Sequence, residues 1–530
     1  MDLTGGKVFD AAMQRSNDAF KNRWLIGGKQ TMCARRFQRM IHRGLAVGAL
    51  FLGLAVHSGC QRADAVSERS GKVTRSELEA AAIAAAAEAA QRSPLLAPQL
   101  DPQLAERMAL MPPSKDQPTP LDSELAALQD KARRFPNKLE SWVLLGQLWV
   151  RRAREAAEPG FYRNADACAD MALRLQAGSP LALNLRALVL MNDHRFADAQ
   201  KVAEQILRRN DFDPMAWGTL SDALLETGQI AAAEEAAQHM MALKPNLPSY
   251  SRASYLHFLH GRSAEAKEAI RLAIDAAQSR SGDTETRAWA IVQAAYLFWH
   301  EGDYEGAEAG FALAEKTLPQ YPPALVGRAQ VALSGGRAAA AVPLLSRAYD
   351  LSPLAETLLL LGDARRLAGD AGGAATAYAQ LEKQGRRSDP RTLAYYFAKR
   401  GQHLDVAKEL IDEERRGRGD PYTLDVQAWV LFRMGQAAEA RRIIDGPGVL
   451  GLGLRDARVL YHAAAIHAAT GDKDGAQRLA ADAVRRNPQF DVDDAAAALA
   501  LAGPLAAPTP LPPTAPPTGS ALATATGSAP

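Results

Sequence analysis

The feature that most constrains this chain is a glycine followed five residues later by an alanine, a pair that returns along the sequence at a nearly constant interval. Most of these glycines are 32 to 36 residues apart. A period of this length indicates a protein built from stacked copies of one small unit. The pairs are Gly228 with Ala233, Gly261 with Ala266, Gly302 with Ala307, Gly336 with Ala341, Gly369 with Ala374, Gly435 with Ala440 and Gly471 with Ala476.

One unit, residues 214 to 245, indicates why the pair is there. Its first half carries apolar residues at spacings of three and four, which places them on one face of a helix: Trp217, Leu220 and Leu224. Gly228 ends this helix, where the backbone often needs the positive φ that glycine adopts freely. A second helix then presents Ala233, Ala237 and Met240, and the small Ala233 lets the two helices lie close together. Such a hairpin cannot bury both of its faces alone, so similar hairpins must stack on it.

This unit resembles the tetratricopeptide repeat (TPR), a helix-turn-helix whose pattern is matched by Trp217, Leu220, Ser221, Gly228, Ala233 and Pro245. Two weaker copies depart from it: His194 stands in place of the glycine, and Gly401 precedes Ala407 by one residue too many. The resemblance implies an all-α, right-handed α-solenoid of about ten hairpins between residues 137 and 488, with an elongated, curved body. Trp217 and Phe311 are predicted to be buried in it.

The flanks are predicted to differ from the array. Helices over residues 121 to 134 and 491 to 502 are predicted to cap its ends, so the solenoid domain covers 121 to 502. Residues 61 to 120 combine an alanine-rich helix with a tether that seven prolines should keep irregular. Residues 503 to 530 are rich in Pro, Ala and Thr and are predicted to be disordered. Longer loops between helices are predicted at 158 to 164 and 279 to 286.

Residues 1 to 60 contain a segment with the order of a secretory signal. Four arginines between positions 35 and 43 precede an apolar run from Gly44 to Val56, which is too short for a membrane span of about 20 residues. The sequence HSGC that follows resembles the lipobox of bacterial lipoproteins, which implies a lipid anchor on Cys60, although His57 departs from the aliphatic residue that this family prefers. The alternatives are a plain signal cleaved near Gly59 and an uncleaved hydrophobic N-terminus.

The segment therefore predicts export to the cell envelope, with the membrane reached only through a lipid anchor or the signal itself. If it is not a functional signal, the protein is cytoplasmic. Met1, Met32 and Met40 are the alternative start sites, and a start at either of the later two makes the signal more ordinary.

No motif for catalysis or cofactor binding occurs in the sequence. Phosphate-binding glycine loops, nucleophile elbows and paired-cysteine metal spacings are absent from it. His257 and His260 lack a neighbouring carboxylate or cysteine to complete a metal site, and Cys168 is predicted to be a buried, small hydrophobic residue. A balance of 62 basic and 60 acidic residues gives no sign of a nucleic-acid partner. We expect no catalytic residue, metal, cofactor or small-molecule substrate.

Partner binding is predicted on the first helices of successive units, which line a concave groove in the family that the units resemble. The richest face lies between residues 289 and 299, where large side chains are spaced three, four and three apart. Aromatic residues with polar tips are enriched at binding hot spots, whereas the alternative is that they only pack between repeats. The candidate groove residues are Asn184, Leu188, Met191, Asp222, Ser251, Tyr255, Phe258, Trp289, Val292, Tyr296 and Trp299.

The sequence therefore favours a non-enzymatic scaffold or adaptor that holds a peptide or helix of a partner protein. The groove positions lack the Lys, Asn and Arg set that clamps acidic tails in some TPR modules, so an apolar or aromatic ligand is expected. One alternative is a structural assembly subunit of an outer-membrane or secretion complex, with contacts spread over the convex face. An enzyme is the remote alternative, because only 42 residues follow Pro488.

Overall fold

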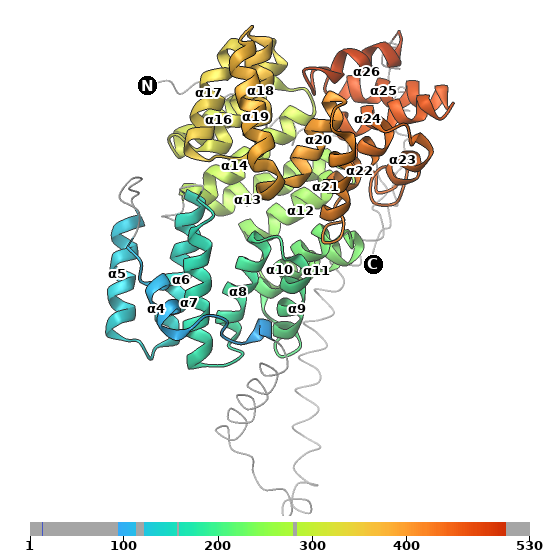
Figure 1. Cartoon of the computed structure of the whole chain (residues 1–530). Helices are drawn as coiled ribbons and strands as arrows, with labels where there is room; N and C mark the ends of the chain where they lie inside the picture. The colour runs from blue at the N-terminus through green and yellow to red at the C-terminus, as the bar shows by residue number, and fades with distance from the viewer. Residues whose placement is uncertain (1–12, 14–93, 113–120, 156–157, 279–283, 505–530) are drawn as a thin grey trace, which may run out of the picture.

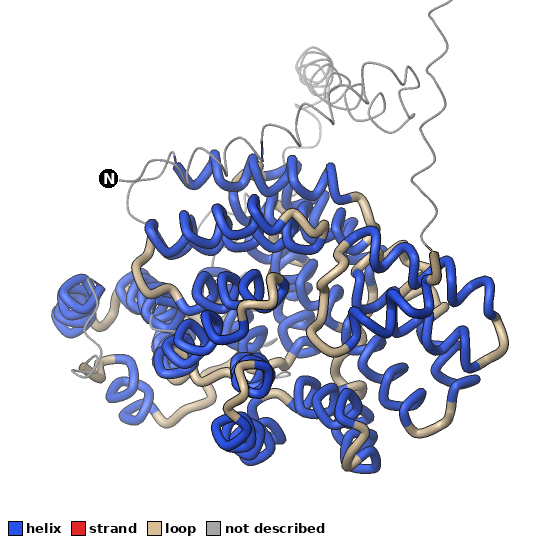
Figure 2. The backbone as a smooth tube through the Cα atoms, turned by 90° about the horizontal axis from the view of Figure 1, so that it is seen from above, coloured by secondary structure: helices blue, strands red, loops and turns tan. Residues whose placement is uncertain are grey.

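The computed structural model describes Met13 and residues 94–112, 121–155, 158–278 and 284–504, and the regular structure in these residues is helical throughout (Figures 1 and 2). Ten helical hairpins follow one another, so the predicted all-α solenoid is confirmed. The hairpins are α6 (Leu139–Glu155) with α7 (Phe161–Leu175), α8 (Pro180–Asn192) with α9 (Phe196–Leu207), α10 (Pro214–Glu226) with α11 (Ile230–Leu243), α12 (Leu247–Leu259) with α13 (Ser263–Gln278), α14 (Thr284–His300) with α15 (Tyr304–Thr317), α16 (Pro322–Ser334) with α17 (Ala338–Leu351), α18 (Ala355–Leu367) with α19 (Ala371–Ser388), α20 (Pro390–Arg400) with α21 (Leu404–Glu414), α22 (Pro421–Arg433) with α23 (Ala437–Ile444), and α24 (Ala457–Ala469) with α25 (Lys473–Arg486).

The hairpins stack in chain order, each second helix packing on the first helix of the next hairpin (Figure 1). Helix α5 (Leu121–Arg134) covers α6 at one end, over the range predicted from the sequence. Helix α26 (Asp494–Ala502) packs on α24 and α25 at the other end. It begins three residues later than predicted. Ahead of it, the Asp491 carboxylate accepts hydrogen bonds from the backbone N–H groups of Asp493 and of Asp494, the first residue of the helix.

Small residues bring the two helices of a hairpin together, as predicted. Ala233 is fully buried, and the Ser221 hydroxyl donates to its carbonyl oxygen at 2.9 Å. The next hairpin repeats this bond between Ser254 and the carbonyl of Ala266, at 2.7 Å. Cys168 in α7 is fully buried, which confirms its prediction as a small core residue.

The periodic glycine is a backbone requirement of the turn inside each hairpin. Gly228 has a φ of 83°, and the other repeat glycines also have positive φ. His194, which replaces the glycine, adopts a φ of 56°, so the geometry is kept even where the residue is not. The predicted loops are shorter than expected, because α7 already begins at Phe161 and α14 at Thr284.

The part of the predicted tether that the structure describes is ordered, which corrects the prediction for this region. Pro94–Leu96 form the 3₁₀ helix η2, and Pro102–Ala109 form α4, which packs on α7. Pro102 does not interrupt α4, because it occupies the first turn of the helix, where a backbone N–H has no intrahelical partner.

A buried ion pair holds this segment against the first hairpins. Arg186, 1% exposed, donates to the carbonyls of Leu95 and Ala97 at 3.3 and 3.1 Å and pairs with Asp170. Asp170 in turn accepts from the backbone N–H of Gln99 at 2.9 Å. The chain ahead of α5 therefore belongs to the folded body from η2 onward.

Several predictions concern residues that lie outside the described part of the chain. They include the signal-like segment 35 to 60 with Cys60, the alanine-rich helix and the tail beyond residue 504. Met13 is described, is 8% exposed and belongs to the buried cluster around α12 and α14. Within the described residues, no helix combines the length and apolar character needed to cross a membrane.

The solenoid curls back on itself, so that the loops after α21, α23 and α25 meet the third, fourth and fifth hairpins. We call this contact the seam. It crosses one buried apolar cluster that contains Leu259 and Ile291 on one side and Leu431 and Val459 on the other. Three polar contacts mark it: the Gly419 N–H donates to the Glu226 carbonyl at 2.7 Å, His260 Nδ1 lies 3.0 Å from the Leu452 carbonyl, and Asn487 Nδ2 donates to the Trp299 carbonyl at 2.8 Å.

The seam corrects the expected open, elongated body. Stacking between neighbouring hairpins predicts only a curved array. The turn glycines allow its distant parts to meet, because they have no Cβ to keep the two backbones apart. A Cβ at Gly228 would lie 2.6 Å from the Gly419 carbonyl oxygen, and one at Gly261 would lie 2.6 Å from that of Gly453. These close backbone approaches turn the concave face into an interior surface.

Of the two aromatic residues predicted to be buried, only Phe311 is. Its exposed fraction is 0%, and its ring meets Tyr296 edge-on with 4.9 Å between centroids. Trp217 is partly exposed: its ring stacks on His239 at 4.4 Å, and its Nε1 donates to the Asp211 carbonyl at 2.7 Å.

Replacing Gly228 with alanine should destabilise the protein more than the same change at Gly435. The φ values, 83° and 82°, give both variants the cost of left-handed backbone, about 1–2 kcal/mol. Only the Cβ at 228 also meets the seam, because nothing lies within 4 Å of one at 435. The extra loss is expected to be about 1–3 kcal/mol. Thermal unfolding followed by circular dichroism measures it, and equal losses would contradict the seam.

Phe311→Ala should lower the free energy of unfolding by about 3–5 kcal/mol, because it empties a fully enclosed site. Trp217→Ala should cost about half as much or less, since its ring already contacts solvent. Urea unfolding midpoints of the two variants and the wild type compare the losses. A larger shift for Trp217→Ala would show that this ring is a principal core residue.

Candidate functional site

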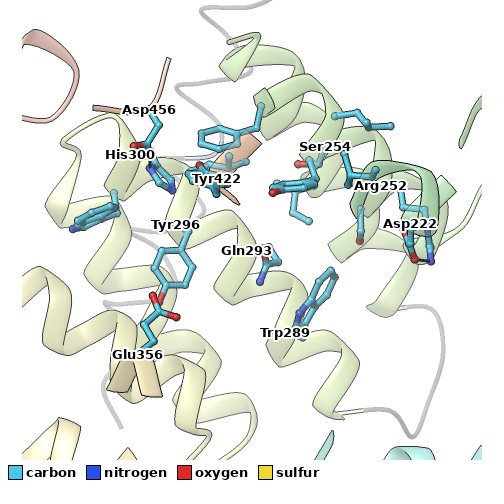
Figure 3. Close-up of a pocket in the computed structure, with 18 of the residues that line it drawn as sticks. Asp222, Arg252, Ser254, Trp289, Gln293, Tyr296, His300, Glu356, Tyr422 and Asp456 are labelled. Carbon is cyan, nitrogen blue, oxygen red and sulfur yellow. Dashed lines mark hydrogen bonds and ion pairs between the residues drawn. The ribbon is translucent and has the colours of Figure 1, made fainter. Parts of the chain in front are cut away.

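The curled solenoid surrounds a central cavity of about 1490 Å³ (Figure 3). Every one of the ten first helices contributes to its lining. The lining residues occupy equivalent positions in successive repeats. In most hairpins the second residue of the first helix lines the cavity, and so does the residue one helical turn later. The second residues are Met215, Pro248, Glu285, Glu356, Arg391, Tyr422 and Arg458, and the residues one turn later are Thr219, Arg252, Trp289, Leu360, Tyr395 and Val426.

Eight of the eleven groove residues chosen from the sequence line this cavity: Leu188, Asp222, Ser251, Tyr255, Phe258, Trp289, Tyr296 and Trp299. The other three do not. Asn184 donates to the Asp213 carboxylate at 2.9 Å, next to the start of α10, and is 5% exposed. Val292, shorter than the aromatic residues along its stripe, is 1% exposed in the core, and Met191 packs on the N-terminal cluster. Asn184 and Val292 are therefore not available to a partner, and Met191 is partly exposed but lies outside the cavity lining.

Helix α14 presents a row of side chains along one wall of the cavity, formed by Trp289, Gln293, Tyr296 and His300 (Figure 3). The Gln293 amide makes no hydrogen bond with a described residue. Burial raises the pKa of Tyr296 well above its ordinary value, so its hydroxyl stays neutral. The row thus offers flat apolar rings, a free amide and a neutral hydroxyl.

Some predicted groove residues are already satisfied within the protein. Asp222 accepts two hydrogen bonds from Arg252, at 2.8 and 2.5 Å, and is neutralised by it. The Ser251 hydroxyl donates to the Leu247 carbonyl of its own helix at 2.8 Å. Both residues shape the wall without offering a free polar group.

His300 joins the cavity wall to the seam. Its Nδ1 lies 3.0 Å from the Asp456 carboxylate, at the start of α24. Although burial raises the pKa of Asp456, the hydrogen bond from His300 and the nearby Arg458 lower it well below its usual range. Trp299 is likewise shared, because its Nε1 donates to the Ser334 hydroxyl at 3.1 Å, which donates to the Gln489 carbonyl.

The rest of the lining includes charged and aromatic residues that sequence reasoning missed. The Arg458 guanidinium lies 5.0 Å from the Tyr395 ring and 5.8 Å from the Tyr422 ring, and 3.9 Å from the Asp425 carboxylate. Glu356 in the first turn of α18 is exposed to the cavity. The signal that could have found these residues is their repeat position, since each is the second residue of a first helix or lies one turn later.

Of the two histidines singled out from the sequence, His260 has a structural partner in the described part of the chain and His257 does not, and His462 is also paired within the protein. His462, fully buried, lies 2.8 Å from the Asp425 carboxylate through Nδ1, and His260 Nε2 lies 2.6 Å from Glu234. His257 approaches no carboxylate to form an ion pair within the described residues. In the same part of the chain, no three His, Cys, Asp or Glu side chains are grouped so that they could hold a metal ion.

Neither a protein-family model nor a curated protein matches this sequence. Among solved structures, the chain is similar to PilW, described as a widely conserved type IV pilus biogenesis factor. The two are 19% identical, the match covers 40% of this chain and 94% of PilW, and the TM-score is 0.34. It is also similar to a tetratricopeptide repeat protein from Parabacteroides merdae, with 16% identity, 51% and 98% covered, and a TM-score of 0.34. Human IFIT1, solved as a dimer with m7Gppp-AAAA, gives 12% identity, 73% and 96% covered, and a TM-score of 0.42. These likenesses do not extend beyond an architecture of stacked helical hairpins.

A buried lysine holds one end of the cavity together. Lys399 lies 2.8 Å from Asp491 and 3.2 Å from Asp363. Against the effect of burial, Lys399 lowers the pKa of Asp491 to about 2. Burial and the charge of Asp491 raise the pKa of the neighbouring Asp494 to about 6. When the pair of Asp491 and Asp494 takes up one proton, Asp494 is therefore the carboxyl that is protonated.

Asp494→Asn should stabilise the protein near neutral pH. The raised pKa means that stability from protonated Asp494 is complete below about pH 4 and is lost as the pH rises through about 6. The asparagine has no charge to desolvate, so a gain of about 1–2 kcal/mol is expected at pH 7, shrinking toward zero near pH 4. Melting temperatures of both proteins across this range measure the gain. A gain that does not change with pH would contradict the assignment.

Proposed function

We propose that this protein is a non-enzymatic scaffold that binds a segment of a partner protein inside its central cavity. The single observation that carries the proposal is that one cavity gathers most of the residues selected from the sequence as a partner surface. Their aromatic rings come from successive first helices and face a shared interior. Aromatic residues that a partner buries on binding are the usual anchors of binding energy.

The size and chemistry of the cavity support a peptide segment as the ligand. Its volume of about 1490 Å³ exceeds the range of about 300–1,000 Å³ that is usual for small-molecule sites. Trp289 and Tyr296 supply apolar contact area, and the free amide of Gln293 between them can bond a peptide backbone. An extended segment along α14 uses all three groups at once.

We place this activity in the cell envelope, with the partner another envelope protein. The support is the signal-like order of residues 35 to 60 and the lipobox-like HSGC that ends at Cys60. A lipid on Cys60 would hold the solenoid at a membrane surface, close to membrane-bound partners.

Trp289→Ala should weaken partner binding strongly, whereas Trp217→Ala should not. Both tryptophans are partly exposed, but only Trp289 lines the cavity, so Trp217 is a matched control for loss of an indole. A hot-spot tryptophan is worth about 2–4 kcal/mol, which corresponds to a loss of affinity of about 30-fold or more. Affinity purification from membrane extract with quantitative mass spectrometry compares the wild type and both variants. Recovery of the same partner at the same level with Trp289→Ala would contradict binding in the cavity.

A further inference from the structure

Glu356 differs from every other carboxylate that lines the cavity. Asp222, Asp363, Asp456 and Asp491 are in ion pairs. Glu285 accepts a hydrogen bond from Tyr321, and Asp389 caps the start of α20 by accepting from the N–H of Thr392. Glu356 makes no hydrogen bond and no ion pair with any residue in the described part of the chain.

The charges that face Glu356 leave it uncompensated. Asp389 lies on the α19–α20 side and opposes its ionisation, whereas Arg458 of α24 and Arg391 of α20 favour it from beyond ion-pair distance. Burial outweighs them and raises the pKa of Glu356. Glu356 is exposed to the cavity and has no partner within the described residues, so its carboxylate is available to form a charge-assisted hydrogen bond with a positive group of a ligand.

We infer that Glu356 receives a basic side chain, a lysine or an arginine, of the partner segment that the cavity binds. The inference rests on the proposed function and adds the chemistry of one subsite to it. The carboxylate lies beside the hydroxyl end of the Tyr296 side chain (Figure 3). An ammonium or guanidinium group held between a carboxylate and an aromatic ring gains an ion pair and a cation–π contact together.

A metal ion does not fit the same place. A divalent cation needs several oxygen or nitrogen ligands, and the described residues contain no group of three such side chains that could hold one. The single carboxylate suits a monovalent organic cation instead. A lysine or arginine also has the length to bring its charge to Glu356 while its backbone follows α14.

The row on α14 indicates how the segment lies. Trp289, Gln293 and Tyr296 lead along the helix toward Glu356 (Figure 3). A ligand that stacks an apolar side chain on Trp289 and bonds its backbone to Gln293 then brings a later side chain to Tyr296 and Glu356. The segment is therefore one that combines an apolar residue with a basic residue a few positions away.

The experiment uses the purified full-length chain and a pool of short, capped synthetic peptides of random sequence. Peptides retained by immobilised protein are sequenced for the wild type, Glu356→Gln, Glu356→Lys, Trp289→Ala and a control. The control is Glu409→Gln, whose side chain is 66% exposed on α21. Circular dichroism and melting temperature confirm that each variant is folded, and the isosteric glutamine keeps the test meaningful if the lysine variant does not fold.

The wild type and Glu409→Gln should retain peptides enriched about tenfold or more in lysine or arginine at one position relative to an apolar residue. Glu356→Gln should lose that enrichment while still retaining peptides, and Glu356→Lys should shift it to aspartate or glutamate. Retention without basic enrichment, or enrichment unchanged by Glu356→Gln, overturns the inference and leaves binding in the cavity standing. If the wild type retains nothing, or Trp289→Ala retains as much, the proposed function fails as well.

Discussion

The seam is the constraint on which the rest of this structure depends. Hairpin stacking alone produces an open array whose concave face is wet and accessible. Contact between backbones at Gly228 and Gly419, and at Gly261 and Gly453, allows two turns of the array to meet without side chains between them. The apolar cluster that continues across this contact makes closure favourable, because parting the turns would expose buried aliphatic surface. The concave groove of an open array thereby becomes a cavity.

Closure changes the electrostatics of the enclosed face. A charge on an open groove is solvated, whereas a charge on the cavity wall must find a partner or shift its pKa. The pairs of Asp222 with Arg252 and of His300 with Asp456 meet this requirement within the protein. Because these side chains are already fixed, a ligand does not have to order them, and less of its binding energy is spent on immobilising the site. The cavity wall is therefore preorganised, apart from the side chains of Glu356 and Gln293, which are unpaired within the described residues.

The sequence predicts the hairpins well and the cavity only in part, for one physical reason. The spacing that places Ala233 against Ser221 spans twelve residues, and such local geometry follows from helical periodicity. The contact between Asn487 and Trp299 spans 188 residues. The repeat period does not determine how strongly the array of hairpins curves, so such a contact cannot be predicted from it. Trp289 and Tyr296 were recognised because both faces of α14 are apolar. Glu356 and Arg458 were missed because each is a single polar residue in its helix. Their place in the cavity lining follows only once the array has closed and equivalent repeat positions face the same interior.

The repeat also sets the spacing at which the cavity can interact with a ligand. Trp289 and Tyr296 are about 10 Å apart along α14 at 1.5 Å per residue, and helices that pack directly on one another lie at a similar distance of about 8–10 Å. An extended peptide advances about 3.3 Å per residue, so every third side chain meets the next contact point whether it runs along a helix or across several. For the proposed peptide ligand, this spacing favours contacts by side chains three residues apart, with the residues between them contributing mainly their backbone. Specificity then lies in the few wall positions whose chemistry differs from one hairpin to the next.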